Sequence, residues 1–331
     1  MAQNNKEYEQ TVRRIAYNNS WPSCGAWKSD LIDKFEAQLN MAGVPQLFCP
    51  IHFNEDVAAK VLYEEYKLNK IVSNILDSYD ELPLHPDYGF DITWRAFEIM
   101  MHLHVNTFDQ SNSNQGLDTL FSRIVDSVFI QQINHSQLLK DSFHRLFCED
   151  MSWSALHYSA ARLFLLPDIQ INKSDQQCPK RCESIIGKNA YDDLKDKFLQ
   201  NGGLDAVNHR KVTLLLNKYV IPCNEFVLSG NHKYTLSIQQ SLTFCISCIL
   251  YTSRCERVHG DYFSPFKSER SSLRQYYDYY WLMLVSYTLT MLLILKYCEK
   301  KELSSFFSVE DVCQSVNNTL DRLKKLLENK L

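Results

Sequence analysis

The sequence predicts an all-α protein, and three observations lead to this fold class. Nearly every periodic segment repeats its apolar residues at three- and four-residue spacing, as one face of a helix requires. Only 9 glycines and 9 prolines occur in 331 residues, whereas a β-sandwich or β-barrel needs many tight turns. Apolar residues make up 45% of the chain, which is enough to fill the core of a globular protein of this length.

The expected helices follow one another along the chain, separated by glycines, prolines or polar stretches. The first, residues 27–42, stops at Gly43, a residue that suits the left-handed position after a helix. Residues 168–184 are polar and are expected to be irregular. The other expected helices are 55–78, 91–107, two or three up to Leu166, 186–200, 203–219, 234–259, one from Ser264 and Pro265 to about Tyr297, and 308–329.

A domain boundary is expected at Pro83 and Pro86, because these two prolines interrupt the helical pattern. The boundary separates an N-terminal helical region of unknown role, residues 1–85, from a larger helical domain, residues 86–331. Asp91 is then the expected N-cap of the first helix in the larger domain.

The net charge of −4 predicts no general attraction to nucleic acid, so RNA binding would need a local basic patch. Residues 254–274 offer one. Its cations are Arg254, Arg257, Lys267, Arg270 and Arg274. Three carboxylates stand among them, so the same stretch also fits a solvated loop followed by the start of a helix.

The 11 cysteines are an odd number and lie in apolar segments, and the N-terminus has no apolar signal core. Together these features indicate free, buried thiols in a reducing cytoplasm. Two pairs have half-site spacing for zinc: Cys178 with Cys182, and Cys245 with Cys248. A CxxxC and a CxxC do not form the usual structural zinc pairing, so we expect no metal and no cofactor.

One segment is apolar enough to raise the question of a membrane. Residues 279–295 carry no charge and come near the lower length limit for a spanning helix. A helix buried on all sides within a protein core has the same composition. Because no second apolar stretch matches it, we expect a buried helix and no membrane association.

The stretch SRCERVHGD, residues 253–261, ends a strongly apolar helix. Arg254 and His259 stand there, and Gly260 can take the left-handed conformation that terminates a helix. A histidine can accept a 2′-hydroxyl proton or protonate a leaving oxygen, and an arginine can hold a phosphate through two hydrogen bonds. The pair therefore fits metal-free RNA cleavage. It also fits an arginine paired with a nearby carboxylate and a histidine that caps the helix.

The motif resembles the signature of HEPN-domain proteins, an all-helical family in which an arginine, four to six residues and a histidine end an apolar helix. Many members read close to Arg-Cys-Asn-Leu-Phe-His-Gly, and the matching residues are Arg254, Cys255, His259 and Gly260. The chain departs at Glu256 and Arg257, where an asparagine and an apolar residue are common. The resemblance covers roughly residues 234–297, with a long apolar helix after the motif, and it implies a helical bundle of HEPN type.

The resemblance implies a metal-independent endoribonuclease, in bacterial defence or a toxin-like role, that leaves a 2′,3′-cyclic phosphate. Arg254 would bind the phosphate and His259 would be the general acid and base. Glu256, Arg257, Lys267 and Arg270 would tune the site or contact RNA. Such enzymes work as pairs, which implies a homodimer through the motif-bearing helices and leaves room for an antitoxin or regulatory partner. The alternative is a non-catalytic HEPN module that binds nucleotide, RNA or a partner protein.

A second polar stripe is expected on the helix at 91–107. Arg95, Glu98 and His102 fall within about 60° of one another around a helix axis, so they share one face. The stripe could line the same cleft as the motif, and Arg95 and His102 could even supply a second Arg…His pair. The alternative is an Arg–Glu pair beside a satisfied core histidine.

Overall fold

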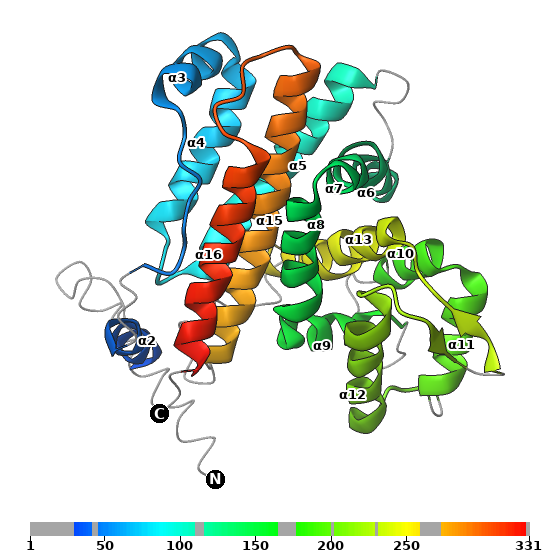
Figure 1. Ribbon diagram of the computed structural model, residues 1–331. Coiled ribbons are helices and arrows are strands. Elements are labelled where there is room, and N and C mark those ends of the chain that lie inside the picture. Colours follow the sequence, from blue (N-terminus) through cyan, green and yellow to red (C-terminus); the bar gives the residue numbers. More distant parts are fainter. Residues whose placement is uncertain are drawn as a thin grey trace.

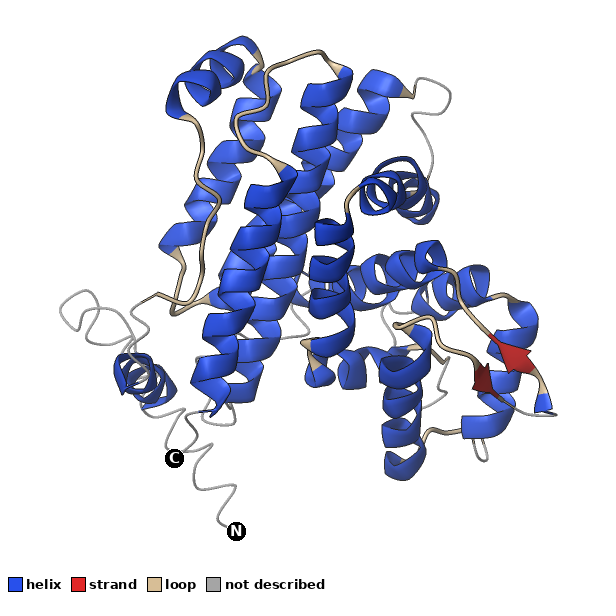
Figure 2. Ribbon diagram, in the orientation of Figure 1, coloured by secondary structure: helices blue, strands red, loops and turns tan. Residues whose placement is uncertain are grey.

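The computed structural model describes residues 30–41, 46–109, 116–164, 177–199, 202–228, 231–258 and 273–328. This part of the chain is mostly helical, which confirms the all-α class (Figure 2). Its one sheet consists of two short antiparallel strands, β1 (Phe226–Val227) and β2 (Lys233–Tyr234).

Four long helices form the main bundle, and they lie side by side in Figure 1. They are α4 (Tyr66–Asp80), α5 (Pro86–Phe108), α15 (Leu273–Lys300) and α16 (Val309–Glu328). Helix α15 packs along α5 and runs in the same direction. Tyr276, near its start, donates to the carbonyl of Leu84 at 2.9 Å, and Tyr297, near its end, meets the ring of Phe108 at 5.5 Å.

Helix α15 contains the apolar segment that raised the question of a membrane. Within the described part of the chain it is the one helix long and apolar enough to span a bilayer. Its most apolar stretch of 18 residues is 94% buried inside the fold. The hydroxyls of Ser286, Thr288 and Thr290 are satisfied within the helix, as when Thr288 donates to the carbonyl of Leu284 at 2.7 Å. Helix α15 is therefore the core helix of the bundle, and the fold is compatible with a soluble protein.

The N-terminal elements α2 (Asp30–Met41), α3 (Glu55–Glu64) and α4 belong to the same hydrophobic core as the later helices. The helix expected over 55–78 is divided in two at Glu65, whose carboxylate accepts a hydrogen bond from Tyr297 at 3.1 Å. The expected boundary at residue 85 falls in the turn between α4 and α5, two helices that pack against each other.

The expected start of α5 at Asp91 is wrong by one and a half turns. Pro86 occupies the first turn of the helix, where its missing N–H costs no hydrogen bond and its fixed φ suits the helix. Asp91 therefore lies inside the helix, and its carboxylate pairs with Arg257 instead of capping.

The remaining helices pack beside the bundle, with α10, α11 and α12 grouped on one side (Figure 1). They are α6 (Leu117–Ile124), α7 (Gln131–His135), α8 (Gln137–His144), α9 (Trp153–Arg162), α10 (Gln177–Ile186), α11 (Lys188–Phe198) and α12 (Ala206–Leu215), with π-helical turns at Val125–Ile130, Arg145–Glu149 and Leu216–Val220. The prediction that residues 168–184 are irregular is wrong for residues 177–184, which form most of α10. Cys178 and Cys182, four residues apart, supply its buried face among polar neighbours.

Candidate functional site

One continuous helix carries the described part of the motif, from Arg254 to Val258. It consists of α13 (Ile238–Phe244), a π-helical segment (Cys245–Leu250) and α14 (Tyr251–Val258). Ser237 and Gln240 form a capping box at its start, so the helix begins after β2 and not at the expected residue 234. Residues 241–250 are all buried. The buried run fixes the helix in the core and brings the motif to its last two described turns.

Several predicted site residues lie outside the described part of the chain. They are His259, Gly260, Lys267 and Arg270, together with the expected helix start at Ser264 and Pro265. The described site therefore consists of Arg254, Glu256 and Arg257 and the side chains that meet them.

Arg257 lies in an ion pair buried against the start of α5. Its Nε and Nη2 donate to the two carboxylate oxygens of Asp91 at 2.8 and 2.6 Å, and Nη1 lies 3.3 Å from Asp87. Its side chain is 7% exposed, and that of Asp87 is fully buried. Burial alone would lower the pKa of Arg257, but the hydrogen bond and charge of Asp91 and the charge of Asp87 outweigh it and raise that pKa. This position fits a residue that tunes the site and not one that reaches RNA.

Glu256 is also paired internally, with Arg162 of α9. The Arg162 Nε donates to Glu256 Oε1 at 2.7 Å, and the guanidinium also lies over the ring of Tyr158 at 4.4 Å. Glu256 is buried. Because a guanidinium neutralises this carboxylate, Glu256 does not present an open negative charge to a phosphate. Glu256 and Arg257 thus each join α14 to another helix.

Arg254 differs from both of its neighbours. Its Nη2 lies 3.6 Å from Glu98 Oε2 of α5, a charge contact longer than a hydrogen bond, and its side chain is 27% exposed. Partial exposure leaves donors of the guanidinium accessible. Of the three charged motif residues that the structure describes, Arg254 is the one able to meet an incoming anion.

The second polar stripe is brought to the motif through Glu98. Arg95 and His102 are exposed on the same face of α5, and Glu98 between them is partly exposed. The alternative prediction pairs Glu98 with Arg95, but Glu98 instead contacts Arg254. His102 is a surface residue and not the core histidine of the alternative prediction.

A buried carboxyl, Asp278, lies beside this cluster and was not singled out from the sequence. Together with Glu256, Arg257 and Ser154 it lines a small cavity of about 90 Å³. The Ser152 hydroxyl donates to the Asp278 carboxylate. Burial raises the pKa of Asp278 to about 6, against hydrogen bonds from Ser152 and Ser154 that lower it. A lone acid directly before the uncharged run at 279–295 was the signal that could have identified it.

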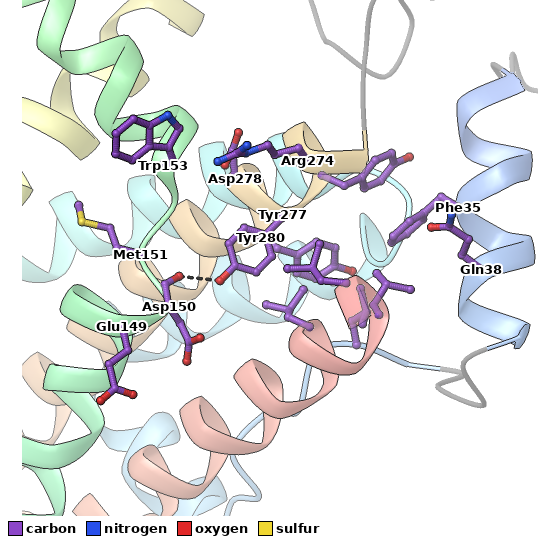
Figure 3. Close-up of a pocket in the computed structure, with 15 residues that line it drawn as sticks. Phe35, Gln38, Glu149, Asp150, Met151, Trp153, Arg274, Tyr277, Asp278 and Tyr280 are labelled. Carbon is purple, nitrogen blue, oxygen red and sulfur yellow. Dashed lines mark hydrogen bonds between the residues drawn. The ribbon is translucent and has the colours of Figure 1, made fainter. Parts of the chain in front are cut away.

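Asp278 also borders a larger cavity of about 350 Å³, shown in Figure 3. Arg274 and Asp278 lie close together at one side, and Phe35 and Gln38 of α2 lie across the opening. The Tyr277 hydroxyl donates to the carbonyl of Asp150 at 2.6 Å. Arg274, one of the cations of the predicted basic patch, is exposed at this opening. The cavity therefore places an aromatic wall and one accessible cation beside the motif.

The cysteines of the two zinc half-sites are free thiols, and all four are buried. Within the described ranges, no group of three or more His, Cys, Asp or Glu side chains is placed to hold a metal ion. Cys178 of α10 contacts Cys248. A hydrogen bond from Cys248 and others from Thr252 and Arg181, together with the charge of Arg181, outweigh burial and lower the pKa of Cys178 to about 7.

The sequence and the fold were compared with protein-family models, curated proteins and solved structures, and none of the three comparisons gives a match.

Proposed function

We propose that the chain is a metal-independent endoribonuclease of HEPN type. Arg254 binds the scissile phosphate and stabilises the charge that grows on it. His259, the sequence partner of Arg254, is the general acid and base. The 2′-oxygen of the preceding ribose attacks phosphorus, the bond to the 5′-oxygen breaks, and the products are a 2′,3′-cyclic phosphate and a 5′-hydroxyl. One proton leaves the 2′-hydroxyl and one is given to the leaving oxygen, so no metal is required.

The observation that carries the proposal is the contrast among the motif residues. Glu256 and Arg257 are taken up by buried ion pairs, whereas Arg254 remains partly exposed with only a long contact to a carboxylate. An arginine held at the end of a rigid, buried helix loses little conformational freedom when it binds a phosphate.

The same proposal includes the wider setting of the enzyme. The chain acts in the cytoplasm, in bacterial defence or a toxin-like role, with RNA as substrate and an antitoxin or regulatory partner as control. Two copies pair through the motif-bearing helices, so that two Arg…His pairs share one cleft and one histidine removes a proton while the other supplies one.

The test is RNA cleavage in the presence of EDTA by the wild type, Arg254→Ala and His259→Ala. We expect wild-type cleavage with cyclic phosphate ends, and a loss of at least about 100-fold in each variant, since removing one transition-state contact typically costs that much. Arg210→Ala is the matched control, because Arg210 is an exposed arginine on α12, away from the motif. Cleavage by Arg254→Ala and His259→Ala at the wild-type rate would disprove the proposal.

A specific observation favours a second function, that of a non-catalytic binding module. Four carboxylates, those of Asp87, Asp91, Glu98 and Glu256, face the described arginines of the site, so its charge is nearly balanced. RNA or a partner protein would then bind without being cut. Retained RNA binding by an inert wild type, lost in Arg254→Ala, would identify this function.

A further inference from the structure

A third cavity, of about 390 Å³, lies beside the N-terminal half of the motif-bearing helix, between α6, α10 and α13. Helices α10 and α13 are neighbours in Figure 1. Its lining is almost entirely polar: Ser122, Arg181, Ser184, Ile185, Ser237, Gln239, Gln240, Thr243 and Ser247. Arg181 supplies a positive charge, and no carboxylate is among these lining residues. The lining therefore selects for an anion.

Three buried residues form the floor of the cavity: Arg181, Thr243 and Ser247 are 4%, 4% and 1% exposed. Ser184 and Ser237 are exposed and form the rim. The Ser247 hydroxyl has no hydrogen-bond partner among the described residues. On the same helix, Thr243 and Ser253 each donate to the carbonyl four residues earlier, as hydroxyls in helices usually do. Ser247 lies in the π-helical segment and is one of the residues that line the cavity, and its own hydroxyl is buried.

Arg181 is held in place before any ligand arrives. Its Nη2 donates to the Thr252 hydroxyl at 3.2 Å, and its guanidinium lies 4.9 Å from the centre of the Tyr251 ring. A guanidinium fixed by such contacts is preorganised for an oxyanion, since its planar fork matches the geometry of phosphate. A buried, oriented arginine next to an unsatisfied hydroxyl is therefore a built anion site and not a chance surface charge.

We propose that this cavity binds a small phosphorylated sugar or polyol. The phosphate meets Arg181 and Ser247 at the floor, and hydroxyl groups of the ligand bond to Gln239 and the serines nearer the rim. The lining residues that the structure describes include no aromatic side chain, so they offer no stacking surface for a nucleobase. The volume lies within the usual range for small-molecule sites. This inference is independent of RNA cleavage.

The experiment is isothermal titration of the full chain with three phosphate esters, glycerol 3-phosphate, ribose 5-phosphate and glucose 6-phosphate. Inorganic phosphate and glucose are titrated in parallel. We expect at least one ester to bind about tenfold more tightly than inorganic phosphate, because its hydroxyls add two or more hydrogen bonds. Glucose, which lacks the charge, binds more weakly than either.

Three variants locate the binding. Arg181→Met raises the dissociation constant of the ester by about 100-fold, the loss expected for two charge-assisted hydrogen bonds. Because Arg181 also contacts Tyr251, Thr252 and Cys178, two milder variants guard against misfolding. Ser247→Ala removes a hydroxyl without a protein partner and Gln239→Ala shortens a partly buried side chain, and each raises the constant by about three- to tenfold. Ser241→Ala is the matched control, since its hydroxyl donates to the carbonyl of Ile221 and borders a different cavity.

Two results overturn the proposal. One is that no ester binds at millimolar concentration, or that none binds more tightly than inorganic phosphate or glucose. The other is that Ser247→Ala and Gln239→Ala bind the ester as the wild type and Ser241→Ala do.

Discussion

Arg254 and Arg257 lie three residues apart on α14, and both face carboxylates of α5. Arg257 makes three contacts of 2.6 to 3.3 Å with Asp87 and Asp91 and is nearly buried. Arg254 makes one contact of 3.6 Å with Glu98 and is about four times more exposed. Two positions on one short helix thus use the same residue types in two different ways. We call Arg257 with Asp87 and Asp91 the inner ion pair, and we call Arg254 with Glu98 the outer contact.

The difference shows that a buried charge serves the structure, whereas a partly exposed charge is available to a ligand. A buried ion pair must stay complete, because removing one partner leaves an uncompensated charge away from water. An exposed pair contributes little to stability, so either partner can exchange its contact for a ligand. Within this motif, the inner ion pair therefore positions the helix end and the outer contact is the part able to bind.

The largest expected effect is that of breaking the inner ion pair. Arg257→Met leaves Asp87 and Asp91 without their cation, and we expect the free energy of unfolding to fall by about 3–5 kcal/mol. Urea denaturation measures it. The triple variant that adds Asp87→Asn and Asp91→Asn should recover much of the loss, because the stranded charges are then gone. If the free energy of unfolding of Arg257→Met decreases by less than about 1 kcal/mol, the pair is not structural.

A pH experiment addresses the carboxyl beside the inner ion pair. The pKa of Asp278 is about 6 in the folded protein and near 3.8 when exposed, so the folded state holds a proton that the unfolded state has lost. Stability from this group is therefore fully present below pH 4 and is lost as pH rises through 6, by about 3 kcal/mol in all. Asp278→Asn removes this dependence. Urea unfolding at pH 5 and 7.5 should show the wild type losing about 1.5 kcal/mol more than the variant, and parallel behaviour would contradict the assignment.

A smaller effect is expected at the pair of Arg162 and Glu256. Arg162→Ala leaves the buried Glu256 carboxylate without its guanidinium, which should cost about 1–3 kcal/mol in unfolding free energy. Adding Glu256→Gln should restore part of that loss, as a double-mutant cycle would show. Additive losses in the two single variants would mean that the pair is not coupled.

The sequence predicted those parts of the fold that depend on local pattern. The helix over 308–329 appears as α16, and the apolar stretch at 279–295 lies in the buried α15, because each carries a continuous apolar stripe or run. The apolar pattern gave a wrong prediction where a tertiary contact, or a proline in the first turn of a helix, determined the local structure. Pro86 moved the start of α5, and the buried Cys178 and Cys182 made a helix of a segment that reads as polar.

The candidate site was predictable in its residues but not in their pairings. Arg254, Glu256 and Arg257 stand out in the sequence as charges at the end of an apolar helix. Which of them would be buried depends on Asp91 and Arg162, which lie 166 and 94 residues away along the chain. The π-helical segment at Cys245–Leu250, whose wider turn alters which side chains share a face, has no signature in residue spacing.

The smallest expected effect on stability is the most informative for function. Glu98→Gln removes the negative charge of the outer contact, and because both side chains are partly exposed and the contact is long, we expect the unfolding free energy to change by less than about 1 kcal/mol. The same change frees Arg254 from a competing carboxylate, so the affinity for RNA should rise by about three- to tenfold at low salt, with a smaller gain at high salt. Filter binding of labelled RNA at two salt concentrations measures this. Asp192→Asn, which alters a carboxylate in an exposed pair with Lys195 on α11, is the matched control and should leave affinity unchanged. If Glu98→Gln also leaves RNA affinity unchanged, the outer contact does not compete with phosphate, and the distinction between the two arginines is structural and not functional.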